Sequence, residues 1–256
     1  MLFDTHAHIY KEYYENIDEV FEDANNSGVG YIAIPGTSIE DSKEAIKTAE
    51  KYENVYALIG IHPENANKYL NDEDIDKDLK EIEKLAENKK VIGIGEIGLD
   101  YYWTKEYINI QKKLLVKQIE LANKLKLPVI LHIREATNDI LEILQKNPPK
   151  YSGIFHSTSF NEHLIKEGLK LGFYISFSGT VTFKNAKPNS SVLLVPDDQL
   201  LVETDSPYLT PHPFRGKTNF PKYVKLTAEK IAEIKEKDFA YIEKITTENA
   251  KKLFKL

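Results

Sequence analysis

The chain has 256 residues, a formal net charge of −6 and no cysteine, with 41% hydrophobic and 29% charged residues. This composition is typical of a globular protein, and it excludes disulfides, thiolate metal ligands and nucleic-acid binding through bulk positive charge. The length fits a single domain over residues 1–256. We expect a cytoplasmic enzyme with no membrane association, because no apolar run is long enough to span a membrane and the first residues enter a strand directly.

Short apolar runs and helical patterns alternate along the chain. The first strand leads from Leu2 and Phe3 into Asp4, and a helix at 17–26 closes at Ser27 and Gly28 before a second strand at 31–35. The remaining strands are expected at 55–61, 91–95, 128–132, 153–156, 173–177 and 200–205, and the remaining helices at 38–52, 75–87, 107–125, 139–145, 161–171, 190–194, 222–236 and 239–254.

Eight strands that alternate with helices favour an α/β fold of the (β/α)8 TIM barrel type, with an open doubly wound sheet as the alternative. Polar residues at the carboxyl ends of five strands favour the barrel, because these ends converge on one mouth in a barrel and spread along an edge in an open sheet. We therefore expect a metal site at the C-terminal ends of the barrel strands. The polar residues concerned are His6, His8, Glu96, His132, His156 and Asp205.

Four imidazoles and two carboxylates suit two divalent metal ions that share a bridging ligand. Glu96 is the natural bridge, because glycines on either side let its backbone approach the site closely. Histidine-rich sites suit Zn or Mn, while phosphoryl transfer often uses Mg. Asp4 and Glu203, each near a ligand on the same strand face, are expected to fix the orientation of ligand histidines.

A small cationic rim is expected around this site. Arg134 and Arg215 are the only arginines in the chain, and Arg134 shares the strand parity of His132. Arg215 and Lys217 follow the last strand, where barrels often bind phosphate. A planar guanidinium is a bidentate donor for phosphate, so we expect these three cations to bind substrate.

Aromatic residues directly after the fourth strand are expected to take part in binding. Tyr101, Tyr102 and Trp103 lie just past Glu96 at the predicted mouth. If they are exposed, they can stack on the bases of a nucleic acid; the alternative is that they pack the rim of the barrel.

Taken together, these motifs resemble the TatD family of metal-dependent deoxyribonucleases, within the amidohydrolase-like barrels. The resemblance runs almost end to end, and the ordered spacing of its motifs makes it specific. The motifs are Asp4-Thr5-His6-Ala7-His8, Gly60-Ile61-His62-Pro63, Gly95-Glu96-Ile97-Gly98-Leu99-Asp100-Tyr101, Leu127 to Arg134, Glu203-Thr204-Asp205-Ser206-Pro207-Tyr208-Leu209 and Arg215-Gly216-Lys217-Thr218-Asn219.

The resemblance implies hydrolysis of DNA phosphodiester bonds, often from the 3′ end, with single-stranded DNA or 3′ ends as substrate. It implies that Asp205 and Glu96 act in catalysis and that His62 and Tyr208 contact the substrate. It also implies one metal held by His6, His8, Glu96 and Asp205, and a second held by Glu96, His132 and His156.

One segment departs from the family pattern. The family commonly has an aromatic residue and a glycine soon after the histidine of the sixth strand, whereas this chain continues from His156 through Ser157, Thr158 and Ser159 to Phe160. We expect the substrate contacts there to differ.

Two other functions stay open. A small-molecule amidohydrolase acting on a cyclic amide or ester is the main alternative, although Glu96 stands where many of those enzymes carry a modified lysine. A metal-binding scaffold without catalysis is disfavoured because no ligand is missing.

Overall fold

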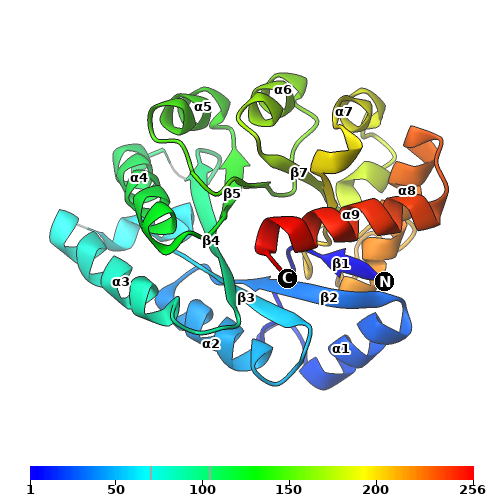
Figure 1. The fold of residues 1–256 in the computed structure, drawn as a ribbon, viewed down its shortest axis with the longest axis horizontal. Coiled ribbons are helices and arrows are strands. Elements are labelled where there is room, and N and C mark those ends of the chain that lie inside the picture. Colours follow the sequence, from blue (N-terminus) through cyan, green and yellow to red (C-terminus); the bar gives the residue numbers. More distant parts are fainter. Residues whose placement is uncertain (70, 104) are drawn as a thin grey trace. The chain divides into compact units, whose positions relative to one another are not determined.

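The computed structural model describes residues 1–69, 71–103 and 105–256 (Figure 1). The strands are β1 (Leu2–Asp4), β2 (Val29–Pro35), β3 (Val55–Ile59), β4 (Val91–Asp100), β5 (Val129–Arg134), β6 (Gly153–Phe155), β7 (Tyr174–Phe177) and β8 (Leu200–Val202). The α-helices are α1 (Ile17–Asn26), α2 (Ile39–Ala49), α3 (Asp72–Leu85), α4 (Ile108–Leu125), α5 (Thr137–Lys146), α6 (Glu162–Lys170), α7 (Asn189–Leu194), α8 (Val224–Lys235) and α9 (Phe239–Phe254). The 3₁₀ helices are η1 (Pro63–Lys68), η2 (Gly179–Thr182), η3 (Asp197–Gln199) and η4 (Pro221–Tyr223).

The strands follow one another in the sheet in chain order, from β1 to β8. The end of β8 also bonds to the segment that follows β1. The N–H of Thr5 donates to the carbonyl of Val202 (3.3 Å), and the N–H of His8 donates to the carbonyl of Ser206 (2.7 Å). An open sheet leaves its first and last strands as edges, whereas a barrel has none. The (β/α)8 class expected from the sequence is therefore confirmed.

The chain forms two compact units. The first unit consists of Met1–Ile34 and His156–Leu256, and the second unit is Pro35–Phe155.

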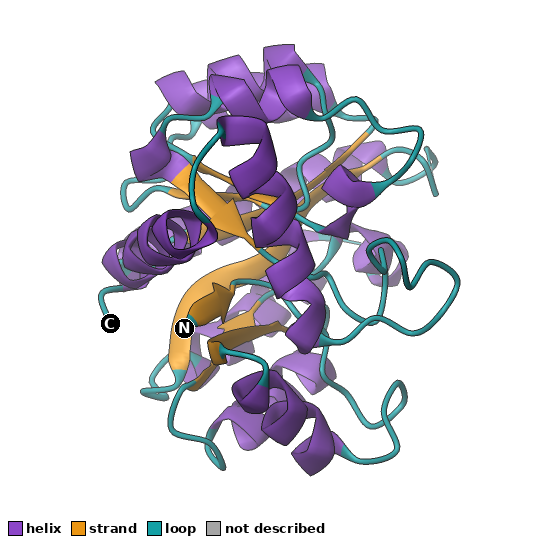
Figure 2. Ribbon diagram, turned by 90° about the vertical axis from the view of Figure 1, so that its right-hand side faces the viewer, coloured by secondary structure: helices purple, strands orange, loops and turns teal. Residues whose placement is uncertain are grey.

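Helix α9 covers strands β1 and β8 of the first unit. In Figure 1 the red α9 runs beside the blue β1, and Figure 2 also shows the two chain ends close together. The ring of Phe3 stacks on Tyr31 at 5.6 Å and contacts Phe254 at 5.8 Å. The hydroxyl of Thr247 donates to the carbonyl of Met1 at 3.0 Å. These contacts anchor the strand that leads into His6.

Helix α1 illustrates how local sequence sets the helices of the first unit. The side chain of Asn16 accepts from the N–H of Glu19 at 3.3 Å and so caps the helix at its start. Val20, Phe21 and Ala24 form its buried face. The helix ends before Gly28, whose φ of +88° is open to glycine and costly for other residues.

Strand β4 of the second unit is longer than the sequence pattern indicates. The pattern ends the strand at residue 95, but β4 runs to Asp100 and is buried throughout. It pairs with β5 through Gly98 opposite His132 and Asp100 opposite Arg134, with an irregularity in register between Ile94 and Ile97. The prediction that Glu96 ends its strand is therefore wrong, because the residue lies at a bulge inside the strand.

The glycines of β4 permit close packing rather than an ending of the strand. A Cβ at Gly95 would lie 2.6 Å from the Cβ of Ile130. A Cβ at Gly98 would lie 2.0 Å from the carbonyl oxygen of His132. Only glycine allows β4 and β5 to approach this closely.

Candidate active site

Two imidazoles and a carboxylate meet in the first unit. The Nε2 atoms of His6 and His8 lie 3.2 Å apart. Oδ1 of Asp205 lies 3.5 Å from Nε2 of His8 and 3.8 Å from Nε2 of His6. The ring of His156 stacks on that of His6, with centroids 4.0 Å apart. The structure thus brings together the four first-unit residues that the sequence singles out as metal ligands.

The end of β1 and the residues after β8 hold this group in place. The N–H of Asp205 donates to the carbonyl of His6 at 2.9 Å. Asp205 also adopts a left-handed backbone with a φ of +55°, which is rare for a non-glycine residue and is found at functional sites. Strand β8 itself ends at Val202, earlier than the expected residue 205.

Asp4 connects the two chain segments rather than the histidine rings. Its carboxylate accepts from the N–H of Thr204 (2.9 Å), the hydroxyl of Thr204 (2.5 Å) and the N–H of His6 (3.3 Å). Burial raises the pKa of Asp4 to about 8. The expectation that Asp4 sets the tautomers of the histidines is therefore wrong, because its oxygens are taken by Thr204 and by backbone N–H groups.

Glu203 does contact a histidine of the group. Its Oε1 lies 3.2 Å from Nδ1 of His156, and the side chain is fully buried. A carboxylate on one ring nitrogen fixes the tautomer and presents the other nitrogen as a lone-pair donor. His156 is thereby prepared to act as a metal ligand through Nε2.

A second cluster lies in the second unit, where His132 stands between two carboxylates. Its Nδ1 is 2.9 Å from Oε1 of Glu96, and its Nε2 is 2.8 Å from Oδ2 of Asp100. The Asp100 carboxylate also accepts from the N–H groups of Tyr102 (2.9 Å) and Trp103 (3.1 Å). A metal ligated by one nitrogen of His132 would leave the other nitrogen to donate to a carboxylate, as metal-binding histidines usually do.

His62 is the third side chain beside Glu96, and its hydrogen bonds indicate which ring nitrogen carries the proton. Its Nδ1 accepts from the N–H of Glu64 at 3.2 Å, and its Nε2 lies 3.5 Å from Oε1 of Glu96. A neutral imidazole that accepts at Nδ1 carries its proton on Nε2. The ring therefore offers Glu96 an N–H donor rather than a lone pair for a metal.

The spacing of the donor atoms fits a divalent metal. Two ligands bound tetrahedrally at 2.0–2.2 Å lie about 3.3–3.6 Å apart. The distances among His6, His8 and Asp205 are 3.2, 3.5 and 3.8 Å. Imidazole and carboxylate donors without thiolates suit Zn, Mn and related ions. The residues present thus fit the metal that their chemistry implies.

Electrostatics keep one carboxylate of each cluster, Asp205 and Asp100, ionised. Burial alone would raise the pKa of Asp205, but the hydrogen bond with His8 and the charges of the neighbouring imidazoles hold it below its usual value. Burial likewise opposes ionisation of Asp100, but hydrogen bonds from His132 and from the N–H of Trp103 lower the pKa of Asp100. Both carboxylates are anionic acceptors at neutral pH.

The aromatic residues after β4 divide into buried and exposed. Trp103 is 64% exposed and Tyr102 is 51% exposed. Tyr101 is buried, and its hydroxyl donates to Oδ2 of Asp139 at 2.7 Å. The expectation that Tyr101 stacks on a base is therefore wrong, because its ring packs inside and its hydroxyl is used by α5.

Arg134 lies on these exposed rings. Its guanidinium carbon is 3.9 Å from the ring centre of Tyr102 and 5.4 Å from that of Trp103. The side chain is exposed and forms no ion pair within the described residues. Stacking fixes the plane of the guanidinium and leaves its N–H groups available to an anion.

The other predicted substrate residues belong to the first unit. Arg215 stacks on Phe183 at 3.8 Å and donates to the carbonyl of Thr210 at 3.2 Å. Lys217 is exposed in the same loop. Tyr208 is 49% exposed, with its ring centre 5.8 Å from that of His8.

The segment that departs from the family pattern is held against β7. The N–H of Thr158 donates to the carbonyl of Ser176 at 3.0 Å. The hydroxyls of Ser157 and Ser178 lie 3.0 Å apart, and Ser157 has a left-handed φ of +40°. Hydroxyl groups thus stand here in place of an aromatic side chain.

Two buried glutamines of α4 are absent from the residues predicted above. The amide of Gln111 exchanges hydrogen bonds with the backbone N–H and carbonyl of Asp100, both at 2.9 Å. Gln118 does the same for Ile61, at 2.8 and 3.0 Å. The sequence does carry a signal for them, because two polar residues seven positions apart interrupt the apolar face of a helix. They fix the backbone beside His132 and His62.

Comparisons with known proteins identify the family of this chain. The family described as TatD related DNase matches residues 3–255. A Bacillus subtilis (strain 168) protein named as an uncharacterized metal-dependent hydrolase, YabD, is 46% identical, with 100% of each chain covered. A protein of the same description in Escherichia coli (strain K12), YcfH, is 35% identical over 99% of this chain and 95% of its own length.

Solved structures show the same fold. The crystal structure of YJJV, a TatD homologue from Escherichia coli K12, aligns with a TM-score of 0.92 at 28% identity, covering 100% of this chain and 98% of that one. A TatD family hydrolase from Entamoeba histolytica aligns with a TM-score of 0.85 at 22% identity, covering 99% of this chain and 98% of that one. Because the family match and the relatives extend over almost the whole chain, this protein belongs to the TatD related DNase family.

Proposed function

We propose that this protein is a metal-dependent hydrolase that cleaves phosphodiester bonds of DNA. The observation that carries the proposal is the convergence of His6, His8 and Asp205 at distances of 3.2–3.8 Å, the spacing of metal ligands. The family description and the names of the relatives, metal-dependent hydrolases, support it.

The residues that would hold metal are imidazoles and carboxylates whose possible ligand atoms lie close together. In the first unit these are His6, His8, His156 and Asp205, and in the second unit Glu96 and His132. Divalent metals, when bound, lower the pKa of water and neutralise the charge of a phosphate. Glu96 stays our predicted bridging ligand.

The protein's own groups would then handle the proton and the charge. Asp205 is ionised and would accept the proton of the water that attacks phosphorus, while the bond from phosphorus to the leaving oxygen breaks. His62 would hold Glu96 in place through its Nε2–H. Arg134 would donate to the phosphate oxygens as negative charge develops on them.

Charge distribution supports a polyanionic substrate despite the net charge of −6. Residues 178–196 and 206–228 contain none of the 40 acidic residues of the chain. These two segments pack together, since the N–H of His212 donates to the hydroxyl of Thr182 at 2.8 Å and Arg215 stacks on Phe183. We name the exposed cations in the loops of these segments (Lys184, Lys187, Arg215 and Lys217) the basic loop pair; in the described residues none of them forms an ion pair.

Finer details of the function remain predictions. These are exonucleolytic attack from the 3′ end, a preference for single strands, the number and identity of the metals and a cytoplasmic location. None of the described helices combines the length and the apolar character needed to cross a membrane.

The test is an assay of metal-stripped protein against labelled single-stranded DNA and a panel of cyclic amides and esters. We expect no turnover without metal and release of nucleotides from DNA when Mg, Mn or Zn is restored. Hydrolysis of an amide or a neutral ester, with DNA left intact under every metal, would favour the small-molecule amidohydrolase instead.

A further inference from the structure

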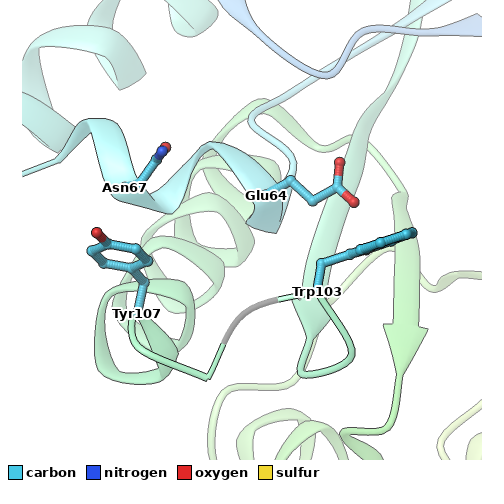
Figure 3. A pocket seen from close by; sticks show the side chains of 4 residues that line it. All are labelled: Glu64, Asn67, Trp103 and Tyr107. Atoms are coloured by element: carbon cyan, nitrogen blue, oxygen red, sulfur yellow. The ribbon is translucent and has the colours of Figure 1, made fainter.

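A slot in the second unit is lined by aromatic groups on one side and polar groups on the other. Trp103 and Tyr107 come from the segment between β4 and α4, and Glu64 and Asn67 come from η1 (Figure 3). Its volume is about 340 Å³, near the lower end of the range for sites that bind small molecules.

We propose that this slot binds a nucleobase that carries an exocyclic amino group: adenine, cytosine or guanine rather than thymine. The inference rests on the proposed nuclease function and adds a base preference to it.

The aromatic side of the slot suits a flat ring. Trp103 is 64% exposed although it is the largest apolar side chain of the protein. Tyr107 lies at the start of α4 and faces the same space. Aromatic rings stack on every base, so this side would hold a base without selecting among the four.

The polar side of the slot would select among the four bases. A carboxylate only accepts hydrogen bonds, so Glu64 can accept from the amino group of cytosine, adenine or guanine. Thymine has no amino group, and its single ring donor, N3–H, lies between two carbonyl oxygens that repel an anion. Within the described residues Glu64 has no lysine or arginine partner; its Oε2 lies 3.8 Å from Nδ1 of His62, and its side chain is 50% exposed. Asn67 both donates and accepts, and amides commonly pair with adenine.

The slot lies beside Arg134, the cation proposed to bind phosphate, and hydrogen bonds through His62 link it to the second cluster. The guanidinium of Arg134 lies 5.4 Å from the ring centre of Trp103, so a base stacked there would have a cation beside it for its phosphate. The backbone N–H of Glu64 donates to His62, whose Nε2 faces Glu96. A nucleotide would thus place its base in the slot and its phosphate toward the reacting groups.

Trp103 makes a direct binding measurement possible because it is the only tryptophan of the chain. Metal-stripped protein is titrated with dAMP, dCMP, dGMP and dTMP while tryptophan fluorescence is recorded, so that no hydrolysis interferes. We expect quenching by the three amino-bearing nucleotides at concentrations about tenfold or more below those needed for dTMP.

Substitutions of Glu64 and Asn67 test whether the polar side of the slot is the source of the base preference. Glu64→Gln should bring dTMP within about threefold of dCMP, because the amide offers a donor to thymine as well as an acceptor. Asn67→Ala should weaken dAMP most. Glu73→Gln, which removes an exposed carboxylate of α3, is the matched control and should leave the order of affinities unchanged.

The outcomes separate the slot from the nuclease. Equal quenching by all four nucleotides, or a base order that Glu64→Gln does not change, overturns the slot whether or not DNA is cleaved. Selective quenching in a protein that cleaves no DNA with any metal supports the slot and overturns the proposed nuclease.

Discussion

Asp205 combines a left-handed backbone, a half-buried position and an ionised carboxylate in contact with two imidazoles. Asp205→Asn keeps the size of the side chain but removes its charge and its capacity to accept a proton. We expect the catalytic rate on DNA to fall by about 10²–10⁴-fold. The rate is measured at saturating substrate with metal content determined in parallel.

Asp198→Asn, at an exposed position of the same unit, is the control and should keep full activity. Near-normal turnover by metal-replete Asp205→Asn protein would assign the proton to another group.

His62 offers a second test at the level of one atom. If its Nε2 carries a proton toward Glu96, then His62→Ala should lower activity while leaving bound metal unchanged. His62→Gln should recover part of the activity, because its amide N–H can replace the Nε2–H. Metal content, measured by elemental analysis, distinguishes a hydrogen-bond donor from a metal ligand. Loss of one equivalent of metal in His62→Ala would show that His62 is a ligand.

Strands β4 and β5 show how an element, rather than a residue, positions the second cluster. Gly98→Ala would force a Cβ to within 2.0 Å of the carbonyl oxygen of His132 and push the strands apart. We expect the free energy of unfolding to fall by at least about 2 kcal/mol, measured by urea denaturation. Activity should fall with it because His132 moves.

Gly172→Ala is a matched control, since Gly172 also has a positive φ (+82°) but a Cβ there would meet no atom within 4 Å. Its cost should be only the backbone term of about 1–2 kcal/mol. Equal losses of unfolding free energy in Gly98→Ala and Gly172→Ala would mean that β5 shifts at little cost to accommodate the added methyl group.

The same strands mark the boundary of what the sequence can predict. The alternation of elements, the barrel class and the gathering of His6, His8 and Asp205 follow from local patterns and strand ends. The continuation of β4 past Glu96 does not, because glycines signal a turn and close packing alike. The burial of Tyr101 could not be foreseen either, since its partner Asp139 lies on a different element.

For the whole molecule, the distribution of charge predicts how DNA binding depends on salt. The net charge is −6, so attraction to DNA must come from local groups such as the basic loop pair. We expect KM for an oligonucleotide to rise with salt. Lys184→Ala combined with Lys187→Ala should lower the slope of log KM against log salt by about 0.7 for each phosphate that the protein no longer neutralises.

The control replaces two lysines that already have acidic partners. Lys166 and Lys170 of α6 pair with Glu162 and Glu167, at 3.2 and 2.7 Å. Their double alanine variant should leave the salt dependence as it is. A KM that ignores salt in all of these proteins would remove the basic loop pair from DNA binding.

The division of the chain into units also sets an order of events during synthesis. The first unit joins Met1–Ile34 to His156–Leu256, so its two parts are separated by the whole second unit. At a translation rate of about 5–20 residues per second, the ribosome takes about 10–30 s after completing β2 to reach Val202. Val202 is the residue whose carbonyl bonds to Thr5, directly after β1. Through that interval the apolar Leu2 and Phe3 lack the cover that α9 later gives them. His6 and His8 therefore cannot meet Asp205 until the ribosome has translated the whole second unit and strand β8.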